Sequence, residues 1–342
     1  MLKALRIENF RGIKKGVLED LAQINLLAGQ NNSGKSTILE SLILARTPFK
    51  QEDLLGRKLS YLQERRVGRY QERPYRFFHF QLESSNLIKL QLRFPDEKMN
   101  FEISSLDEGT NLRIGVRAGP SGPFSDLFFD YAGNRIKNSP PQTKYRDYLE
   151  GILLIDAESV RRFDLFEEKL WRGIFERRAD KEIREIVNEA YGLEVEGFTF
   201  PEPGRTPLYV QMPQYSVPVD VLGEGLRYAL SILSAAVCLK RTALLIEELE
   251  VHQHPDSLEK MLKALFMIAR RNELQLFIST QSGELIAKAI DIAQSLNLEL
   301  RIFHLILNGE GELVTRALSA PDAKLLSEIG PDIRMLHKYV KV

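Results

Sequence analysis

Residues 24–45 read INLLAGQNNSGKSTILESLILA, and this stretch decides the fold. The apolar run INLLAG has the length and composition of a buried strand, and STILESLILA repeats apolar residues at helical spacing. Between them, GQNNSGKS fits the pattern G-x-x-x-x-G-K-[ST], with Gly29, Gly34, Lys35 and Ser36 at its fixed positions. A strand, a glycine loop and a helix in this order predict a phosphate-binding loop. The alternative is a chance glycine-rich turn.

The glycine loop indicates how a nucleoside triphosphate would be held. Its glycines let backbone N–H groups turn towards phosphate oxygens, and the helix N-terminus adds a favourable dipole. Lys35 is expected to reach the β- and γ-phosphates, and Ser36 is expected to bind Mg²⁺. The loop residues expected at the nucleotide are Asn31, Asn32, Ser33, Gly34, Lys35, Ser36 and Thr37.

A second apolar run ends abruptly in acidic residues. LLIEELEVHQHP, residues 244–255, places Glu247, Glu248 and Glu250 directly after it. Carboxylates this close repel one another and resist desolvation, so we expect a cation beside them. With the glycine loop upstream, Glu247 is expected to hold the Mg²⁺ shell through water. Glu248 is expected to position or deprotonate the attacking water. The alternative is a solvated acidic turn.

Composition limits the class of protein. The 342 residues contain 47 Lys+Arg and 47 Asp+Glu, a formal net charge of zero, so any nucleic-acid surface must be local. This length suggests two compact units or one core with a large insertion. Cys238 is the only cysteine, so it forms no internal disulfide and is expected to be a small buried hydrophobe. Because no secretory or membrane-length apolar segment is visible, we expect a cytoplasmic protein without a membrane partner.

Five segments, in this order, resemble the ABC-type ATPases of the RecF, SMC and OLD group, which act in DNA repair and anti-phage defence. They are ALRIENFRGIKKG (4–16), the glycine loop, LGEGLRYAL (222–230), the acidic strand end, and LQLFISTQSGELI (274–286). The resemblance covers the chain to about residue 286. It implies an α/β fold, a P-loop NTPase of the ABC-ATPase type, whose mixed central sheet is flanked by helices. An antiparallel β lobe and a small helical lid complete it, without a long coiled coil or a fused nuclease.

The same resemblance implies ATP and Mg²⁺ as cofactors and assigns further residues. Arg11, in the NFRG turn, is expected near the nucleotide. Gly223 and Gly225 occupy the place of the ABC signature, where a helix N-terminus meets the γ-phosphate bound to a second protomer. The implied working unit is an ATP-dependent homodimer around two ATP molecules, or a larger assembly. The alternative for these glycines is a turn before a buried core helix.

Two positions depart from the family pattern. The acid on the Mg²⁺ side is usually Asp and here is Glu247, and the switch residue is usually His and here is Gln281. Glutamine cannot carry a proton, but it can orient a water molecule, so we expect hydrolysis that is slow or is stimulated by a partner or DNA. His252 and His254 could form a transition-metal site with the acids. The alternative is that the His254-Pro255 pair shapes a turn.

The chain divides into four expected units. Residues 1–50 and 216–342 would form the two parts of the ATPase core, residues 51–150 an inserted β lobe, and residues 151–215 the helical lid. Alternating or apolar runs predict strands in the lobe at 76–82, 86–94, 99–104 and 111–117, and a hairpin over 299–318. A segment containing a sensing glutamine is expected near the nucleotide, with Gln81 and Gln91 as candidates.

Residues 56–76 form the most basic local stretch, with seven basic and two acidic side chains and three interleaved tyrosines. This mixture is typical of surfaces that neutralise phosphates and stack bases. The arginines expected to contact DNA are Arg57, Arg65, Arg66, Arg69, Arg73 and Arg76. Two alternatives are a solvated helix and a surface for an acidic protein.

The leading functional hypothesis is an ATP-binding and ATP-hydrolysing switch that dimerises around two ATP molecules. It would regulate a DNA-processing or anti-phage defence complex, with a separate effector such as a nuclease. The alternative is an ATP-clamped scaffold that hydrolyses slowly or not at all. A transporter ATPase is disfavoured because LGEGL is a poor match to its signature. A sequence-specific DNA-binding protein is disfavoured because no helix-turn-helix or zinc pattern is visible.

Overall fold

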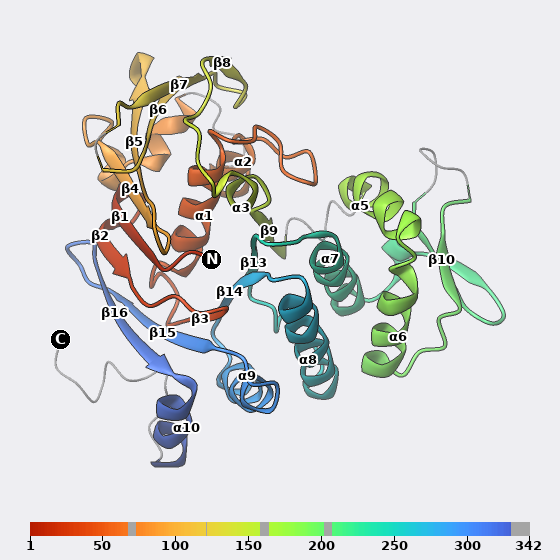
Figure 1. Cartoon of the computed structure of the whole chain (residues 1–342). Coiled ribbons are helices and arrows are strands. Elements are labelled where there is room, and N and C mark those ends of the chain that lie inside the picture. Colours follow the sequence, from red (N-terminus) through yellow and green to blue (C-terminus); the bar gives the residue numbers. More distant parts are fainter. Residues whose placement is uncertain (68–72, 121, 158–163, 202–206, 330–342) are drawn as a thin grey trace.

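The computed structural model describes residues 1–67, 73–120, 122–157, 164–201 and 207–329 (Figure 1). The strands of its large sheet are β1 (Ala4–Phe10), β2 (Ile13–Leu18), β3 (Ile24–Ala28), β4 (Ile88–Arg93), β5 (Lys98–Leu106), β6 (Asn111–Ala118), β7 (Ser125–Phe129), β8 (Arg135–Lys137), β9 (Leu153–Ile155), β13 (Ala243–Glu247), β14 (Gln275–Thr280), β15 (Leu300–Leu307) and β16 (Glu312–Ser319). Their order is β8-β7-β6-β5-β4-β1-β2-β16-β15-β3-β14-β13-β9.

The helices lie on both sides of this sheet. They are α1 (Lys35–Arg46), α2 (Tyr61–Val67), α3 (Arg146–Glu150), α5 (Asp164–Glu176), α6 (Asp180–Tyr191), α7 (Glu224–Cys238), α8 (Pro255–Arg271), α9 (Gly283–Ser295) and α10 (Ala320–Ile329). Short 3₁₀ turns are η1 (Pro74–Phe78), η2 (Phe80–Leu82), η3 (Asp107–Gly109) and η4 (Val219–Val221). In β3, alternate residues face opposite layers: Leu26 packs with the cluster of α5–α9, and Leu27 packs with the cluster of α1.

Four parallel strands bring the predicted motifs to one edge of the sheet. β3, β14, β13 and β9 are neighbours and pair in parallel. They are almost wholly buried, as expected for strands covered by helices on both faces. The glycine loop follows β3, the acid pair ends β13, and Gln281 follows β14. Because parallel strands end on the same side, these residues converge.

The antiparallel strands continue the same sheet. β4 pairs with β1, and β5, β6 and β7 follow in order, with alternate residues buried along β4. Strands predicted at 86–94, 99–104 and 111–117 are therefore confirmed. The hairpin predicted over 299–318 is confirmed as β15 and β16. The predicted mixed α/β architecture, a central sheet flanked by helices with an antiparallel β lobe, is thus confirmed.

The strand predicted at residues 76–82 is wrong. The segment lies in η1, which begins at Pro74, and in η2, and Gln81 and Leu82 have the left-handed φ values of 54° and 61°. Phe78, together with the preceding Tyr75, is fully buried within these turns, and among the described residues the strand pairing of this segment is limited to one isolated bridge between Phe10 and His79.

The expected lid contains a second sheet beside its helices. Helices α5 and α6 pack with α7 and α8, and Figure 1 shows them on the far side of α7 from the large sheet. A three-stranded antiparallel sheet joins them, formed by β10 (Gly197–Thr199), β11 (Tyr209–Gln211) and β12 (Ser216–Pro218). Trp171 of α5 is fully buried and contacts Phe198 of β10, which fixes the small sheet against the helices.

Candidate nucleotide-binding site

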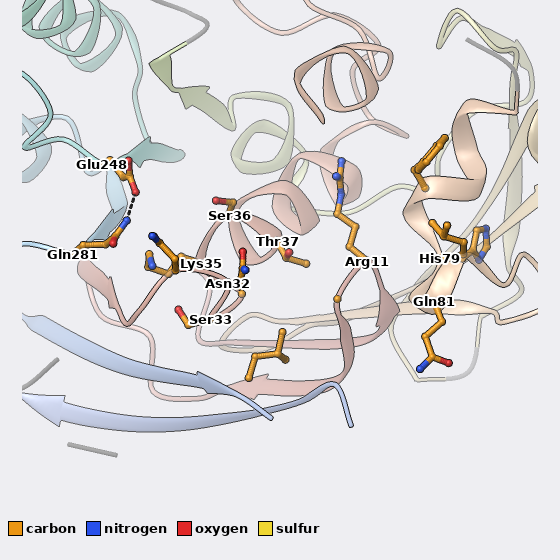
Figure 2. A pocket seen from close by; sticks show the side chains of 16 residues that line it. Arg11, Asn32, Ser33, Lys35, Ser36, Thr37, His79, Gln81, Glu248 and Gln281 are labelled. Atoms are coloured by element: carbon orange, nitrogen blue, oxygen red, sulfur yellow. Dashed lines mark hydrogen bonds between the residues drawn. The ribbon is translucent and has the colours of Figure 1, made fainter. Parts of the chain in front are cut away.

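A cavity of about 800 Å³ lies over the glycine loop (Figure 2). Its lining residues are Arg11, Gly12, residues 31–37, Phe77, His79, Gln81, Leu82, Glu248, Gln281 and Leu307. All seven predicted loop residues, Arg11, Glu248 and Gln281 are thus brought together. Glu248 and Gln281 lie at one end, and His79 and Gln81 lie at the other, with the loop between them.

The glycine loop has little room for larger residues. Gly34 caps the N-terminus of α1 with a left-handed φ of 92°, which favours glycine. A Cβ at Gly29 would lie 2.6 Å from Ser33 Oγ and 2.7 Å from the carbonyl oxygen of Leu305. The buried Ser33 hydroxyl has no hydrogen-bond partner among the described residues. A tight backbone cradle with an unsatisfied hydroxyl fits a phosphate group.

Lys35 is buried within the loop. Its Nζ donates hydrogen bonds to the carbonyl oxygens of Gly29 at 2.8 Å and Gln30 at 2.7 Å. Burial lowers the pKa of Lys35, and the nearby carboxylates, with Glu248 the strongest, oppose this effect. The ammonium group is therefore held at the phosphate cradle and faces the acidic strand end.

The two residues predicted for Mg²⁺ are in contact. The Ser36 hydroxyl donates a hydrogen bond to Glu247 Oε1. A hydroxyl and a carboxylate are hard oxygen donors, which suit Mg²⁺, so this pair fits the predicted ion.

The transition-metal alternative has no support in the described residues, because they contain no cluster of three or more His, Cys, Asp or Glu side chains that could hold a metal. His252 Nε2 instead lies 3.0 Å from Glu224 Oε2. His254 Nδ1 accepts from the N–H of Asp256 at 3.3 Å and caps α8.

Glu248 and Gln281 form a hydrogen-bonded pair at the end of the cavity (Figure 2). Gln281 Nε2 donates to Glu248 Oε1 at 2.6 Å. Glu248 has a left-handed φ of 51°, and its N–H donates to the carbonyl oxygen of Ser279 at 3.0 Å. Such backbone geometry in a residue other than glycine is uncommon and tends to occur at functional sites. The pair presents a carboxylate and an amide to the cavity, which could together orient a water molecule.

Glu250 fixes the backbone that carries Gln281. Its Oε1 accepts from Thr280 Oγ1 at 2.7 Å and from the N–H of Gln281 at 2.9 Å. The sequence pattern includes Glu250 among the acids but predicts no role for it. These hydrogen bonds join residues about thirty positions apart, and a local sequence pattern does not reveal such contacts.

Arg11 lines the cavity, but its guanidinium group is engaged elsewhere. Its Nε lies 2.8 Å from Glu40 Oε2 of α1, and its Nη2 donates to the carbonyl oxygen of Leu62 at 2.7 Å. Of the two candidate sensing glutamines, Gln81 lines the cavity. Gln91 donates to Asn100 Oδ1 at 2.8 Å within the sheet.

The signature glycines do not line this cavity. Gly223 is exposed at the N-terminus of α7. A Cβ at Gly225 would lie 2.3 Å from the carbonyl oxygen of His252, so the close approach of two backbones requires glycine there. Gln253 Nε2 also donates to the carbonyl oxygen of Gly225 at 2.7 Å. Their predicted contact with a nucleotide on a second protomer stays a prediction.

The basic stretch is not a continuous surface, and the prediction that Arg57 and Arg65 face DNA is wrong. Arg57 is 7% exposed and pairs with Asp53 Oδ2 at 2.7 Å, and its Nη2 donates to the carbonyl oxygen of Leu154. Arg65 is paired with carboxylates beside the candidate site. Tyr61, expected to stack on bases, is buried too.

Where the structure describes the side chains of this stretch, two of its arginines are exposed. Arg73 pairs with Glu108, and Arg76 Nε donates to the carbonyl oxygen of Leu82 at 3.0 Å. Arg69 and the side chain of Arg66 lie outside the described residues.

Comparisons with known proteins agree with this geometry. The family described as "AAA ATPase domain" matches residues 1–152, and the family "AAA domain, putative AbiEii toxin, Type IV TA system" matches residues 213–287. An "ATP/GTP phosphatase" of Helicobacter pylori is 21% identical over 330 residues, covering 84% of this chain and 86% of the relative. An "OLD nuclease" of Thermus scotoductus is 25% identical over 326 residues, and the match spans 59% of that protein.

A solved structure has the same fold. The SMC head bound to the C-winged helix domain of ScpA superposes with a TM-score of 0.58 at 13% identity, covering 95% of this chain and 99% of that one. Within the described residues, no helix combines the length and apolarity needed to cross a membrane. The phosphate-binding cavity, the two matching ATPase families and the SMC-head fold together support an ABC-type ATPase that resembles the SMC and OLD proteins.

Proposed function

We propose that this protein is a Mg²⁺-dependent ATPase switch that dimerises around two ATP molecules and regulates a separate effector. The observation that carries the proposal is the Glu248–Gln281 pair at the end of the glycine-loop cavity. A nucleotide whose phosphates lie on the loop would present its γ-phosphate towards this pair.

The residues of the chain divide the chemistry between them. The loop N–H groups and Lys35 bind the phosphates, while Ser36 and Glu247 would hold the metal ion. When bound, Mg²⁺ neutralises charge that develops on the phosphate oxygens. The Gln281 amide and the Glu248 carboxylate orient a water molecule, and Glu248 accepts its proton. Because Gln281 cannot itself carry a proton, we expect a low basal rate that a partner or DNA increases.

Dimerisation is supported by the position of the signature. Gly223 is exposed, and neither signature glycine lines the cavity of its own chain, so a second chain is needed to bring this helix N-terminus to a phosphate.

An effector is proposed because one relative is named a nuclease. The effector would be a separate chain such as a nuclease in a DNA-processing or anti-phage defence complex. For DNA itself, the exposed candidates among the described residues are Arg73 and Arg76.

The decisive experiment measures steady-state ATP hydrolysis with Mg²⁺, with and without DNA. Glu248→Gln should lower turnover by about 10²- to 10⁴-fold, the usual contribution of a general base, while ATP binding persists. Glu259→Gln is the matched control, because Glu259 is an exposed acid of α8 that pairs with Lys288. Light scattering should show dimers of Glu248→Gln with ATP. A wild-type protein that binds no ATP would refute the proposal.

The second candidate is an ATP-clamped scaffold. Its specific support is Gln281, which stands where a proton-carrying histidine is usual. This function predicts ATP binding and dimerisation without measurable turnover in the wild type, even with DNA present. Glu248→Gln would then change neither binding nor the oligomeric state.

A further inference from the structure

Arg65 of α2 joins three carboxylates from three other parts of the fold. Its Nε lies 3.1 Å from Asp156 Oδ2, just after β9, and its Nη1 lies 3.1 Å from Glu40 Oε1 of α1. Its Nη2 contacts Glu247 Oε2 at the end of β13. The guanidinium group thus links the helix of the glycine loop to the two strand ends beside the metal residues.

This cluster is buried and needs its positive charge. The side chain of Arg65 is 8% exposed, while those of Glu40 and Asp156 are 0% and 2% exposed. The neighbouring carboxylates raise the pKa of Arg65 despite its burial, so it stays charged. A guanidinium group presents five N–H donors in one plane and can serve several carboxylates at once, which a lysine cannot do with the same geometry.

Glu247 is held from both sides by this arrangement. Its Oε1 accepts from the Ser36 hydroxyl, and its Oε2 contacts Arg65. Within the described residues, no other cationic side chain forms an ion pair with Glu247. The carboxylates of Glu40 and Asp156 have additional partners, because Arg11 pairs with the first and Tyr61 donates to the second.

The length of the Glu247 side chain explains why contacts with Arg65 and Ser36 are needed to fix its carboxylate. Glutamate has one more side-chain torsion than the aspartate usual at this position, so it has more freedom to lose when it is fixed. Contacts on both carboxylate oxygens remove that freedom and leave Oε1 beside Ser36.

We propose that Arg65 is a positioning residue for the metal side of the nucleotide site. It holds Glu247 so that Oε1 faces Ser36, and it ties α2 to the ends of β9 and β13. This inference rests on the proposed use of Mg²⁺ and ATP. It assigns to the basic stretch a role inside the ATPase site.

The test is a Mg²⁺ titration of the binding of a fluorescent ATP analogue, which does not require turnover. Arg65→Gln should weaken the apparent Mg²⁺ affinity by about 10- to 100-fold, the usual effect of removing a group that orients a metal ligand. Binding of the analogue in EDTA should change little. Arg65→Lys keeps the charge without the planar donors and should give an intermediate loss.

Arg57→Gln is the matched control. Arg57 is equally buried and comes from the same stretch, but it pairs with Asp53 and not with Glu247. Its replacement should lower thermal stability and leave the Mg²⁺ dependence unchanged. In a double-mutant cycle, Arg65→Gln should have little further effect once Glu247 is glutamine.

The experiments test the positioning role of Arg65 separately from the ATPase proposal. Unchanged Mg²⁺ dependence in both Arg65 variants would overturn the positioning role, and so would an equal loss in Arg57→Gln. If Arg65→Gln does not fold, Arg65→Lys and the Glu247→Gln cycle built on it decide the question. A wild type that binds the analogue without hydrolysing it refutes the ATPase proposal but not this one. A wild type that does not bind it refutes both.

Discussion

Replacing Glu250 by glutamine should slow ATP hydrolysis without weakening ATP binding. Glu250 does not line the cavity, but its Oε1 holds Thr280 Oγ1 at 2.7 Å and the N–H of Gln281 at 2.9 Å. Gln281 in turn donates to Glu248. The carboxylate therefore fixes the segment that aims the amide at the candidate general base.

The magnitude follows from these contacts. A hydrogen bond to a charged group is worth about 1.5–3 kcal/mol and a neutral one about 0.5–1.5, so neutralising Glu250 weakens each bond by about 1 kcal/mol. The new amide nitrogen would replace Oε2, which is buried without a hydrogen-bond partner among the described residues. If about 2 kcal/mol of this loss is felt in the transition state, kcat falls about 30-fold.

The assay compares kcat, KM and the affinity for a fluorescent ATP analogue. Thr280→Val is the matched variant, since it removes one of the two bonds to Glu250 outright; such a bond is worth about 1.5–3 kcal/mol, so we expect kcat to fall at least about tenfold if the loss is felt in the transition state. Wild-type kcat in Glu250→Gln would refute the reasoning. Equal losses in kcat and in analogue affinity would also contradict it, because they would indicate general damage to the site.

Three further predictions test the packing and the titrating groups. Gly29→Ala should lower Tm without nucleotide and weaken ATP binding, because its Cβ would meet the backbone oxygen of Leu305, whereas Gly173→Ala in α5, with open space around it, should not lower Tm. Burial lowers the pKa of His79 below 6.5, so as the pH falls the unfolded chain binds a proton before the folded protein does. The free energy of unfolding should therefore fall as the pH drops below 6.5. His79→Gln should flatten the dependence of Tm on pH between about pH 8 and 5. Burial raises the pKa of Cys238 to about 11, so native protein should react with iodoacetamide at pH 8 about 100-fold more slowly than unfolded protein.

Local patterns were sufficient to predict the ATPase core. The glycine loop, the acidic end of β13 and the segment after β14 each have a strong local signal, and parallel strands bring such signals to one edge. The segment at 76–82 shows where local patterns fail. Its alternating apolar residues fit a strand, but burial of Tyr75 and Phe78 in the core determines the turns that form. Gln81 consequently reaches the cavity from a left-handed position that no pattern indicated.

The basic stretch shows a deeper limit of sequence reasoning. Its excess charge appears in any local count, but the partners of Arg65 lie 25, 91 and 182 positions away along the chain, at Glu40, Asp156 and Glu247. A local count therefore cannot separate a buried, neutralised arginine from one that is free to bind DNA.

The acidic strand end raised the reverse question, because its carboxylates required a cation that the local sequence does not supply. The sequence motifs predict Mg²⁺ as this cation. The structure shows a second positive charge, the Arg65 guanidinium group, on Oε2 of Glu247, while the Ser36 hydroxyl contacts Oε1. The positive charge of the basic stretch and the negative charge at the end of β13 are therefore partly explained by the same contact, in which Arg65 pairs with Glu247. A rearrangement that moves α2 away from the end of β13 would break the contact between Arg65 and Glu247. Through this contact α2 is linked to the metal side of the proposed ATPase site.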